Sequence, residues 1–366
     1  MGFLKPLQIT SVLVALYAYK LSTNPGSYRA WTENIPLPIQ FSSTDCETAP
    51  GFEDLGKLPG AEDVEISGNL VFVSIGLRYD VIAHYMAPTV WQGVFVYDAD
   101  FPKNDPVKIS LENANPHGIS LFRVSKNLVR VFVVSHEKVT DGSGREEIIV
   151  FDYDVMNRVK TNEMRIADEL MVSVNDVKAI AANKFVATND FLVKHWLVKK
   201  VIMYLFVRNG NVVEISFKNE NITDSRIVLS GLTMANGVNY QNGRLVVNEP
   251  TNGVVNVYDW HSFEVAPELV KTIKLEMIAD NINFDDDGSL IVAGWMGPLL
   301  NSLLKKHDMM SMVVEIDGKS LEPVKTLFHD VDGEFSVSSA AKYKENQVWI
   351  GSPTNSLLFC EKKAKN

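Results

Sequence analysis

The sequence is poor in cysteine and in basic residues. Only two of its 366 residues are cysteine, Cys46 and Cys360, so at most one disulfide can form within the chain. The formal net charge is −10 at pH 7, which weighs against a nucleic-acid partner because phosphate neutralisation needs clustered lysine and arginine. An acidic surplus is instead compatible with bound cations. Hydrophobic residues make up 46% of the chain and charged residues 22%, which excludes wholesale disorder.

The N-terminus lacks a hydrophobic run of full membrane-spanning length. The apolar stretch Leu7–Tyr19 is well short of the roughly 20 residues that a spanning helix needs. It is closer to the apolar region of a secretory signal, but no small-x-small cleavage site follows it. We expect residues 1–22 to be a signal retained as a membrane anchor, with cleavage as the alternative. Residues 23–45 would then connect this anchor to a body spanning residues 46–366.

Such a signal predicts the secretory pathway, with the protein at the endoplasmic reticulum membrane, at the cell surface or secreted. In an oxidising compartment Cys46 and Cys360 could join the two ends of the body. The triplet "NIT" at Asn221 is an N-glycosylation sequon that fits the same compartment, although such triplets also occur by chance.

Six internal stretches share one pattern. Each begins with small polar or acidic residues, continues as a short apolar strand, turns at Gly or Asn, and resumes as a second apolar strand. The copies are spaced 45 to 60 residues apart when counted from Asp63, His117, Asp176, Asn236, Asn281 and Ser338. Further strand-like segments such as "QGVFVYDAD" and "GVVNVYDW" follow the copies, which indicates about four strands per unit.

Six such units predict an all-β fold, a six-bladed β-propeller. A pair of β-sandwiches would also contain many strands, but it would not explain why every repeat begins with a polar cluster. In a propeller the inner strands begin around one central channel. The six polar starts should therefore converge there.

Two segments interrupt the repeats. "FLVKHWLVKKVIMYLF" (191–206) has the pattern of an amphipathic helix, and "MGPLLNSLLKKHDMM" (296–310) has a similar character. We expect both to be short lid helices over the face where the repeats begin. Contact with a membrane and simple packing on the propeller are both open for them.

The repeat starts are rich in oxygen ligands. Their carboxylate and carboxamide side chains are Glu62, Asp63, Asn175, Asp176, Asn236, Asp280 and Asn281. Hard oxygen ligands suit calcium, whereas zinc would require histidine and cysteine. Adjacent residues point in opposite directions, so one doublet could serve two ions. A single Asn or Asp is more often a turn former, but carboxylates converging on one channel would repel each other without a cation.

One histidine lies at an unusual place. His117 of "NPHGIS" stands between a proline and a glycine, directly before a run that should be a buried strand. A histidine that enters a core there must be hydrogen-bonded, catalytic or metal-bound.

Several short motifs occur in one order along the chain. They are "AEDVEI", "NPHGIS", "VNDVKAI", "TND", "ANGVN", "ADNI" and the terminal "LLFCE". Together they resemble the paraoxonase/arylesterase family of calcium-dependent lactonases and esterases, from about residue 40 to 361. The resemblance implies two calcium ions. The catalytic ion would be held by Glu62, Asn175, Asn236, Asp280 and Asn281, and the structural ion by Asp63, Asp176 and the backbone carbonyl of Ile119.

The resemblance also implies roles for the histidines and the cysteines. His117 would lie beside the catalytic ion as general base, with His136 of "VVSHEK" behind it to orient it or relay the proton. Water would attack an ester or lactone carbonyl that calcium polarises. A structural role is the alternative for each histidine. Cys46 and Cys360 would form the family's ring-closing disulfide.

The chain departs from the family pattern in "VAGWMGP". Trp295 stands where the family's hydrolases commonly have a pocket histidine, and Gly294 where several have a free cysteine. Two functions are therefore open. The first is a calcium-dependent hydrolase of small-molecule lactones and aryl esters. The second is a non-catalytic membrane protein of the endoplasmic reticulum that helps to assemble ion channels, as some animal relatives do. A sugar-lactone hydrolase fits the ordered motifs less well.

Overall fold

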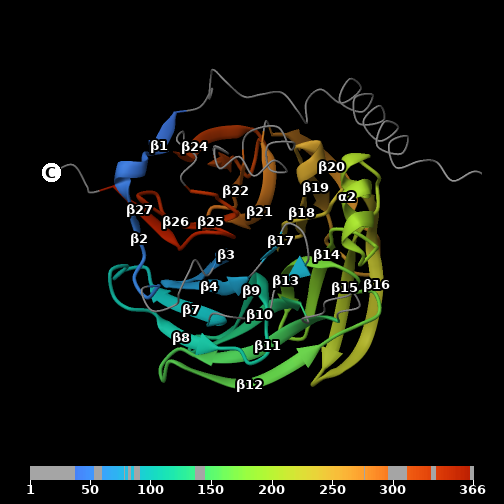
Figure 1. Cartoon of the computed structure of the whole chain (residues 1–366), viewed down its shortest axis with the longest axis horizontal. Coiled ribbons are helices and arrows are strands. Elements are labelled where there is room, and N and C mark those ends of the chain that lie inside the picture. The colour runs from blue at the N-terminus through green and yellow to red at the C-terminus, as the bar shows by residue number, and fades with distance from the viewer. Residues whose placement is uncertain are drawn as a thin grey trace, which may run out of the picture.

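The computed structural model describes residues 38–52, 60–77, 79–80, 84–85, 91–136, 145–275, 277–295, 311–330 and 335–362. Their strands form six large sheets arranged as blades around a central axis (Figure 1). The fold is a six-bladed β-propeller, as the repeats predicted. The expected anchor at 1–22 and the second expected lid helix at 296–310 lie outside the described residues.

The first three blades each contain four antiparallel strands. Blade 1 contains β3 (Gly60–Ser67), β4 (Leu70–Leu77), β7 (Gly93–Asp98) and β8 (Val107–Ser110), with the short pair β5 (Tyr79–Asp80) and β6 (His84–Tyr85) between β4 and β7. Blade 2 contains β9 (Pro116–Ser125), β10 (Leu128–His136), β11 (Glu146–Asp154) and β12 (Val159–Ile166). Blade 3 contains β13 (Val174–Ala181), β14 (Lys184–Asn189), β15 (Gly210–Lys218) and β16 (Asn221–Leu232).

The last three blades complete the ring. Blade 4 contains β17 (Val238–Gln241), β18 (Arg244–Glu249), β19 (Val254–Asp259) and β20 (Glu268–Lys274). Blade 5 contains β21 (Ile278–Phe284), β22 (Leu290–Trp295), β23 (Ser311–Ile316), β24 (Pro323–Asp330) and the added β1 (Ile39–Phe41). Blade 6 contains β25 (Ser339–Lys344), β26 (Gln347–Gly351), β27 (Leu358–Glu361) and β2 (Cys46–Thr48). The described chain also contains two short 3-10 helices, Ser43–Asp45 and Pro250–Asn252.

Turn chemistry fixes the register of the hairpins. Asn242 and Gly243 separate β17 from β18, and Gln241 pairs with Arg244 across the turn. Both turn residues have positive φ, 51° and 79°, as a two-residue type I′ turn requires. Asn-Gly is the pair that adopts this turn at least cost, so the turn fixes the register of the alternating residues in β17 and β18.

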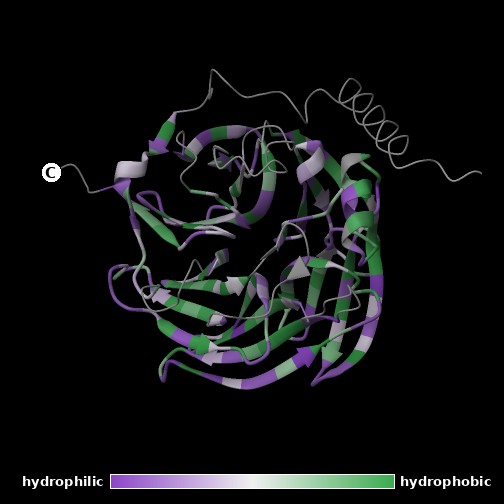
Figure 2. Ribbon diagram, viewed as in Figure 1, coloured by the Kyte–Doolittle hydropathy of each residue, from purple (hydrophilic) through white to green (hydrophobic). Residues whose placement is uncertain are grey.

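Apolar side chains hold neighbouring blades together. Every residue of β4 is buried, since the second strand of a blade has a sheet on each side. Phe132 of blade 2 packs on Phe185 and Phe217 of blade 3, with ring centroids 6.0 and 6.3 Å apart. Burial of each such ring contributes about 1.5–3 kcal/mol. Outer strands such as β12 are more exposed and more hydrophilic (Figure 2).

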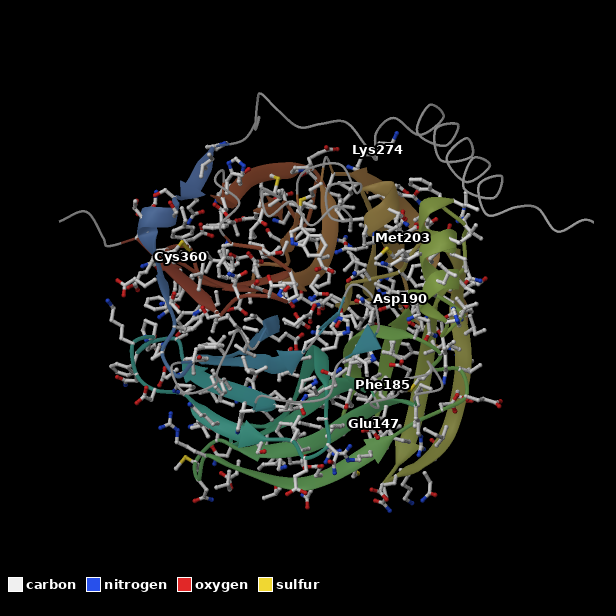
Figure 3. All side chains as sticks on the ribbon, in the orientation of Figure 1. Glu147, Phe185, Asp190, Met203, Lys274 and Cys360 are labelled. Atoms are coloured by element: carbon white, nitrogen blue, oxygen red, sulfur yellow. A yellow bond between two sulfur atoms is a disulfide. The ribbon has the colours of Figure 1, made fainter. Side chains whose placement is uncertain are left out.

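The two ends of the body meet in blade 6. Strand β2, from the N-terminal side, pairs with β27, and this register places Cys46 opposite Cys360. The two cysteines form a disulfide that joins positions 314 residues apart, so the predicted pairing is confirmed (Figure 3). Of the connecting segment expected at 23–45, the described strand β1 takes part in the propeller, because it pairs in parallel with β24. A strand of three residues is too short to be recognised from its pattern.

One helix interrupts blade 3. Helix α2 (Trp196–Tyr204) lies between β14 and β15, at the end of the blade where β13 begins. The first expected lid is therefore helical over part of its length. Leu197 and Val198 on its outer side are 52% and 43% exposed. Within the described ranges, no helix is long and apolar enough to cross a membrane.

Candidate active site

The inner strands of all six blades begin at the same end of the axis. Neighbouring inner strands contact one another around the ring, which brings their first residues together. Buried at this end are Glu62, Asp63, His117, Ile119, Asn175, Asp176, Asn236, Asp280 and Asn281. The residues selected from the repeat starts thus form one cluster, drawn from blades 1 to 5. We call it the axial cluster.

Direct contacts connect these side chains across blades. Asn281 Nδ2 donates to Glu62 Oε1 at 3.2 Å, which joins blade 5 to blade 1. His117 Nε2 lies 3.5 Å from the same Glu62 oxygen. At Gly118, a Cβ atom would lie 2.5 Å from a carboxylate oxygen of Asp176, so the glycine allows blades 2 and 3 to approach closely.

Two aspartates of the cluster accept hydrogen bonds from the chain. Asp63 accepts from the backbone N–H of Val64 and of Ile119, each at 2.8 Å, and from the Ser339 hydroxyl at 2.6 Å. Asp176 accepts from the N–H of Val177 and of Val238, each at 2.7 Å. Each carboxylate therefore links its own blade to the next.

Four other oxygens of the cluster lack such donors. Within the part of the chain that the structure describes, no hydrogen bond reaches Glu62 Oε2 or the side-chain carbonyl oxygens of Asn175, Asn236 and Asn281, although all four are buried. Buried acceptors without donors are costly. Four hard oxygens from four blades fit a calcium ion, which takes carboxylate and carbonyl ligands. Among the described residues, no three His, Cys, Asp or Glu side chains form a group that could hold a metal ion. A metal site here would therefore need the asparagine oxygens as well.

The charges of the cluster also favour a bound cation. Burial raises the pKa of Glu62 to about 8, and burial with the Glu62 charge raises the pKa of Asp63 to about 7. Burial also raises the pKa values of Asp176 and Asp280 well above the ordinary range. No described lysine or arginine forms an ion pair with any of these four carboxylates. A bound cation would favour their charged forms.

Two histidines and a glutamate form a chain behind Glu62. His117 Nδ1 is 2.9 Å from His136 Nε2, and His136 Nδ1 is 2.5 Å from Glu146 Oε2. Burial lowers the pKa of His117 to about 4 and lowers the pKa of His136 as well. Sequence reasoning selected both histidines and missed Glu146. The β10–β11 register places Glu146 opposite His136, and no local sequence pattern around Glu146 indicates this pairing.

The lid contributes a charged side chain near the histidines. Lys199 of α2 donates to the Ser173 hydroxyl, lies 3.8 Å from Asp190 Oδ1, and covers the Phe191 ring at 5.8 Å. After burial, the Asp190 charge has the largest effect on the pKa of His117, which it raises, and the Lys199 charge lowers that pKa. Helix α2 is therefore anchored at the edge of the axial cluster. Neither Lys199 nor Asp190 was selected from the sequence.

The remaining predicted residues lie away from the cluster or at its border. Asn221 is exposed at the start of β16, on the outer strand of blade 3. Trp295 ends β22, and its indole Nε1 is buried without a hydrogen-bond acceptor among the described residues.

Comparison with known proteins identifies the family. The arylesterase family model matches residues 55–362, so this chain belongs to the arylesterase family. The chain is 30% identical to serum paraoxonase/arylesterase 1 of Mus musculus, over 99% of this chain and 100% of the mouse protein. It is 28% identical to serum paraoxonase/arylesterase 2 of Gallus gallus, with the same coverage of both chains.

Solved structures agree on the fold. The chain matches a luciferin-regenerating enzyme with a TM-score of 0.52 and 12% identity, covering 86% of this chain and 94% of that one. It also matches regucalcin of Agrobacterium tumefaciens, described as a calcium-binding protein, with a TM-score of 0.50 and 10% identity, covering 90% and 98%. Family and fold together support a hydrolase of the esterase and lactonase type, in a family that is generally calcium-dependent. They do not favour a non-catalytic assembly role.

Proposed function

We propose that this protein is a calcium-dependent hydrolase of lactones and aryl esters. The proposal rests on four oxygens that have no hydrogen-bond donor among the described residues, from Glu62, Asn175, Asn236 and Asn281, beside the His117–His136 pair. The paraoxonase/arylesterase names of the relatives and the calcium-binding description of regucalcin support it.

Two ions fit the two kinds of acidic residue. A catalytic calcium would be held by Glu62, Asn175, Asn236, Asp280 and Asn281. A structural calcium would be held by Asp63, Asp176 and the carbonyl of Ile119. The carboxylates of the two aspartates already link neighbouring blades by hydrogen bonds. Calcium at the first site would polarise the substrate carbonyl and stabilise the negative oxygen that forms during hydrolysis.

His117 would act as the general base. Its Nε2 faces Glu62, and as water attacks the carbonyl carbon this nitrogen takes the proton that the water loses. His136, 2.9 Å behind it, shares the resulting positive charge. The tetrahedral intermediate then collapses with cleavage of the ester C–O bond, and the histidine proton passes to the departing alkoxide or phenoxide. The products are a carboxylate and an alcohol, or one hydroxy acid from a lactone.

We also propose that the protein is located in the secretory pathway. A disulfide between Cys46 and Cys360 favours an oxidising compartment, and the exposed Asn221 is accessible for glycosylation there. Residues 1–22 would anchor the protein to the membrane of the secretory pathway.

Hydrolysis assays test the function directly. The full chain is assayed with phenyl esters and lactones, in calcium and with chelator, beside the His117→Gln variant. We expect turnover that requires calcium and falls at least about 100-fold in the variant. A folded, calcium-loaded protein whose turnover equals that of the variant would refute the hydrolase and favour an assembly factor for membrane proteins such as ion channels.

A further inference from the structure

Glu146 is placed to control the histidine pair. It is the first residue of β11 and stands directly opposite His136, the last residue of β10. Its Oε2 lies 2.5 Å from His136 Nδ1, and the two side chains are 11% and 2% exposed. A hydrogen bond between a carboxylate and a buried imidazole is short and strong because the acceptor is charged.

This contact determines which nitrogen of each ring carries a proton. A carboxylate only accepts, so the proton of neutral His136 must lie on Nδ1. His136 Nε2 is then an acceptor, and the proton of His117 must lie on Nδ1 to complete the 2.9 Å bond. The acceptor lone pair of His117 is consequently on Nε2, the nitrogen that faces Glu62 and the axial cluster.

We propose that Glu146 is a positioning residue for catalysis. It fixes the tautomers of both histidines, and it stabilises the positive charge that the pair gains when His117 takes a proton from water. This inference rests on the proposed hydrolase function. Glu146 touches neither the reacting atoms nor the residues that would hold calcium.

The neighbouring residue provides a matched control. Glu147 follows Glu146 in β11, so its side chain points to the opposite face of the sheet. It accepts a hydrogen bond from Arg165 at 2.5 Å. Replacement of each glutamate by glutamine changes the same charge in the same strand, but only one change affects the histidine chain.

Kinetics give the first test. In calcium, we expect Glu146→Gln to lower kcat about 10- to 100-fold, as loss of an outer partner of a site residue typically does, with KM within about twofold of the wild type. Glu147→Gln should retain the wild-type kcat. Wild-type kcat in Glu146→Gln, or equal losses in both variants, would overturn the inference.

A spectroscopic test separates this inference from the proposed function. Ring ¹⁵N NMR of histidine-labelled protein, with His136 assigned from a His136→Gln variant, should show His136 protonated on Nδ1. Glu146→Leu should lose that signature, whereas Glu147→Leu should keep it. If the wild type hydrolyses nothing, the hydrolase proposal fails on its own. A proton on Nε2 of His136 in the wild type would refute the role of Glu146 whatever the activity.

Discussion

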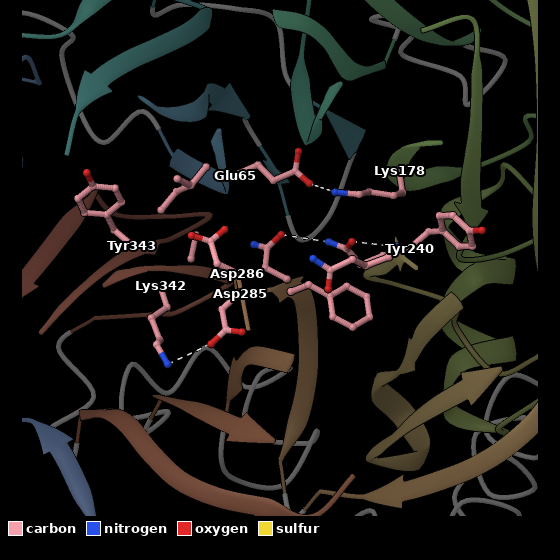
Figure 4. A pocket seen from close by; sticks show the side chains of 13 residues that line it. Glu65, Lys178, Tyr240, Asp285, Asp286, Lys342 and Tyr343 are labelled. Atoms are coloured by element: carbon pink, nitrogen blue, oxygen red, sulfur yellow. Dashed lines mark hydrogen bonds and ion pairs between the residues drawn. The ribbon is translucent and has the colours of Figure 1, made fainter. Parts of the chain in front are cut away.

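The two ends of the propeller axis handle buried acidic residues in opposite ways. At the end where the inner strands begin, Glu62 and the aspartates of the axial cluster have no lysine or arginine partner among the described residues. A few residues further along the same strands lies a pocket of about 160 Å³, and two of the acids that line it have lysine partners (Figure 4). Glu65 pairs there with Lys178, and Asp285 with Lys342 at 3.0 Å.

The difference indicates what each end is built to do. The far end has lysines of its own, so Glu65 and Asp285 find cationic partners within the polypeptide. The axial cluster has no such partner among the described residues, and a cation supplied from outside would balance its charged form, as proposed above. Buried charge without a partner costs several kcal/mol, and natural chains retain such clusters mainly where they bind something.

Removal of calcium should have the largest effect. Ligands that bind only the folded state at 1,000 times their dissociation constant stabilise it by about 4 kcal/mol. We therefore expect chelation to abolish hydrolysis and to lower Tm by roughly 5 °C. Calorimetry with and without chelator measures the shift, and magnesium in place of calcium serves as a control. Equal melting temperatures in calcium and in chelator would contradict the metal assignment.

Matched substitutions at the two ends should give opposite results. Glu62→Gln removes a charge from the axial cluster, so in chelator its stability should equal or exceed that of the wild type, because repulsion is relieved. In calcium it should be the less stable protein. Glu65→Gln leaves Lys178 buried without its partner, which should cost about 3 kcal/mol in either condition.

Calcium titrations of both variants by calorimetry complete this comparison. We expect Glu62→Gln to bind calcium weakly and to be inactive, and Glu65→Gln to bind it as the wild type does. If the two variants lose calcium affinity equally, the distinction between the two ends is wrong.

A smaller effect is expected at the lid. Lys199 reaches the edge of the axial cluster from α2 and not from a blade. Lys199→Met should release the contact with Ser173 and loosen the lid by about 1 kcal/mol, which corresponds to roughly fivefold faster chymotryptic cleavage within 191–206. Lys200→Met, one position further along the helix, is the control. Unchanged cleavage in Lys199→Met would show that this contact does not hold the lid.

Much of this molecule is predictable from local patterns. Alternation and turn signals such as Asn242-Gly243 repeat six times, so the blades and their polar starts are visible without a structure. The axial cluster follows from the same periodicity, because equivalent positions of a closed ring must meet. Glu146 and Lys199 are different, since Glu146 reaches the site through the register of β11 on β10 and Lys199 reaches it from helix α2, which interrupts blade 3.

The sequence by itself determined the propeller, the ring of oxygen side chains and the two histidines, because these are encoded once in every repeat or in short motifs. Only the tertiary structure decided which oxygens lack donors, which acids have lysine partners, and which residue stands behind His136. Those properties depend on register across loops and on contacts between blades far apart in the chain. Local sequence carries no record of such contacts.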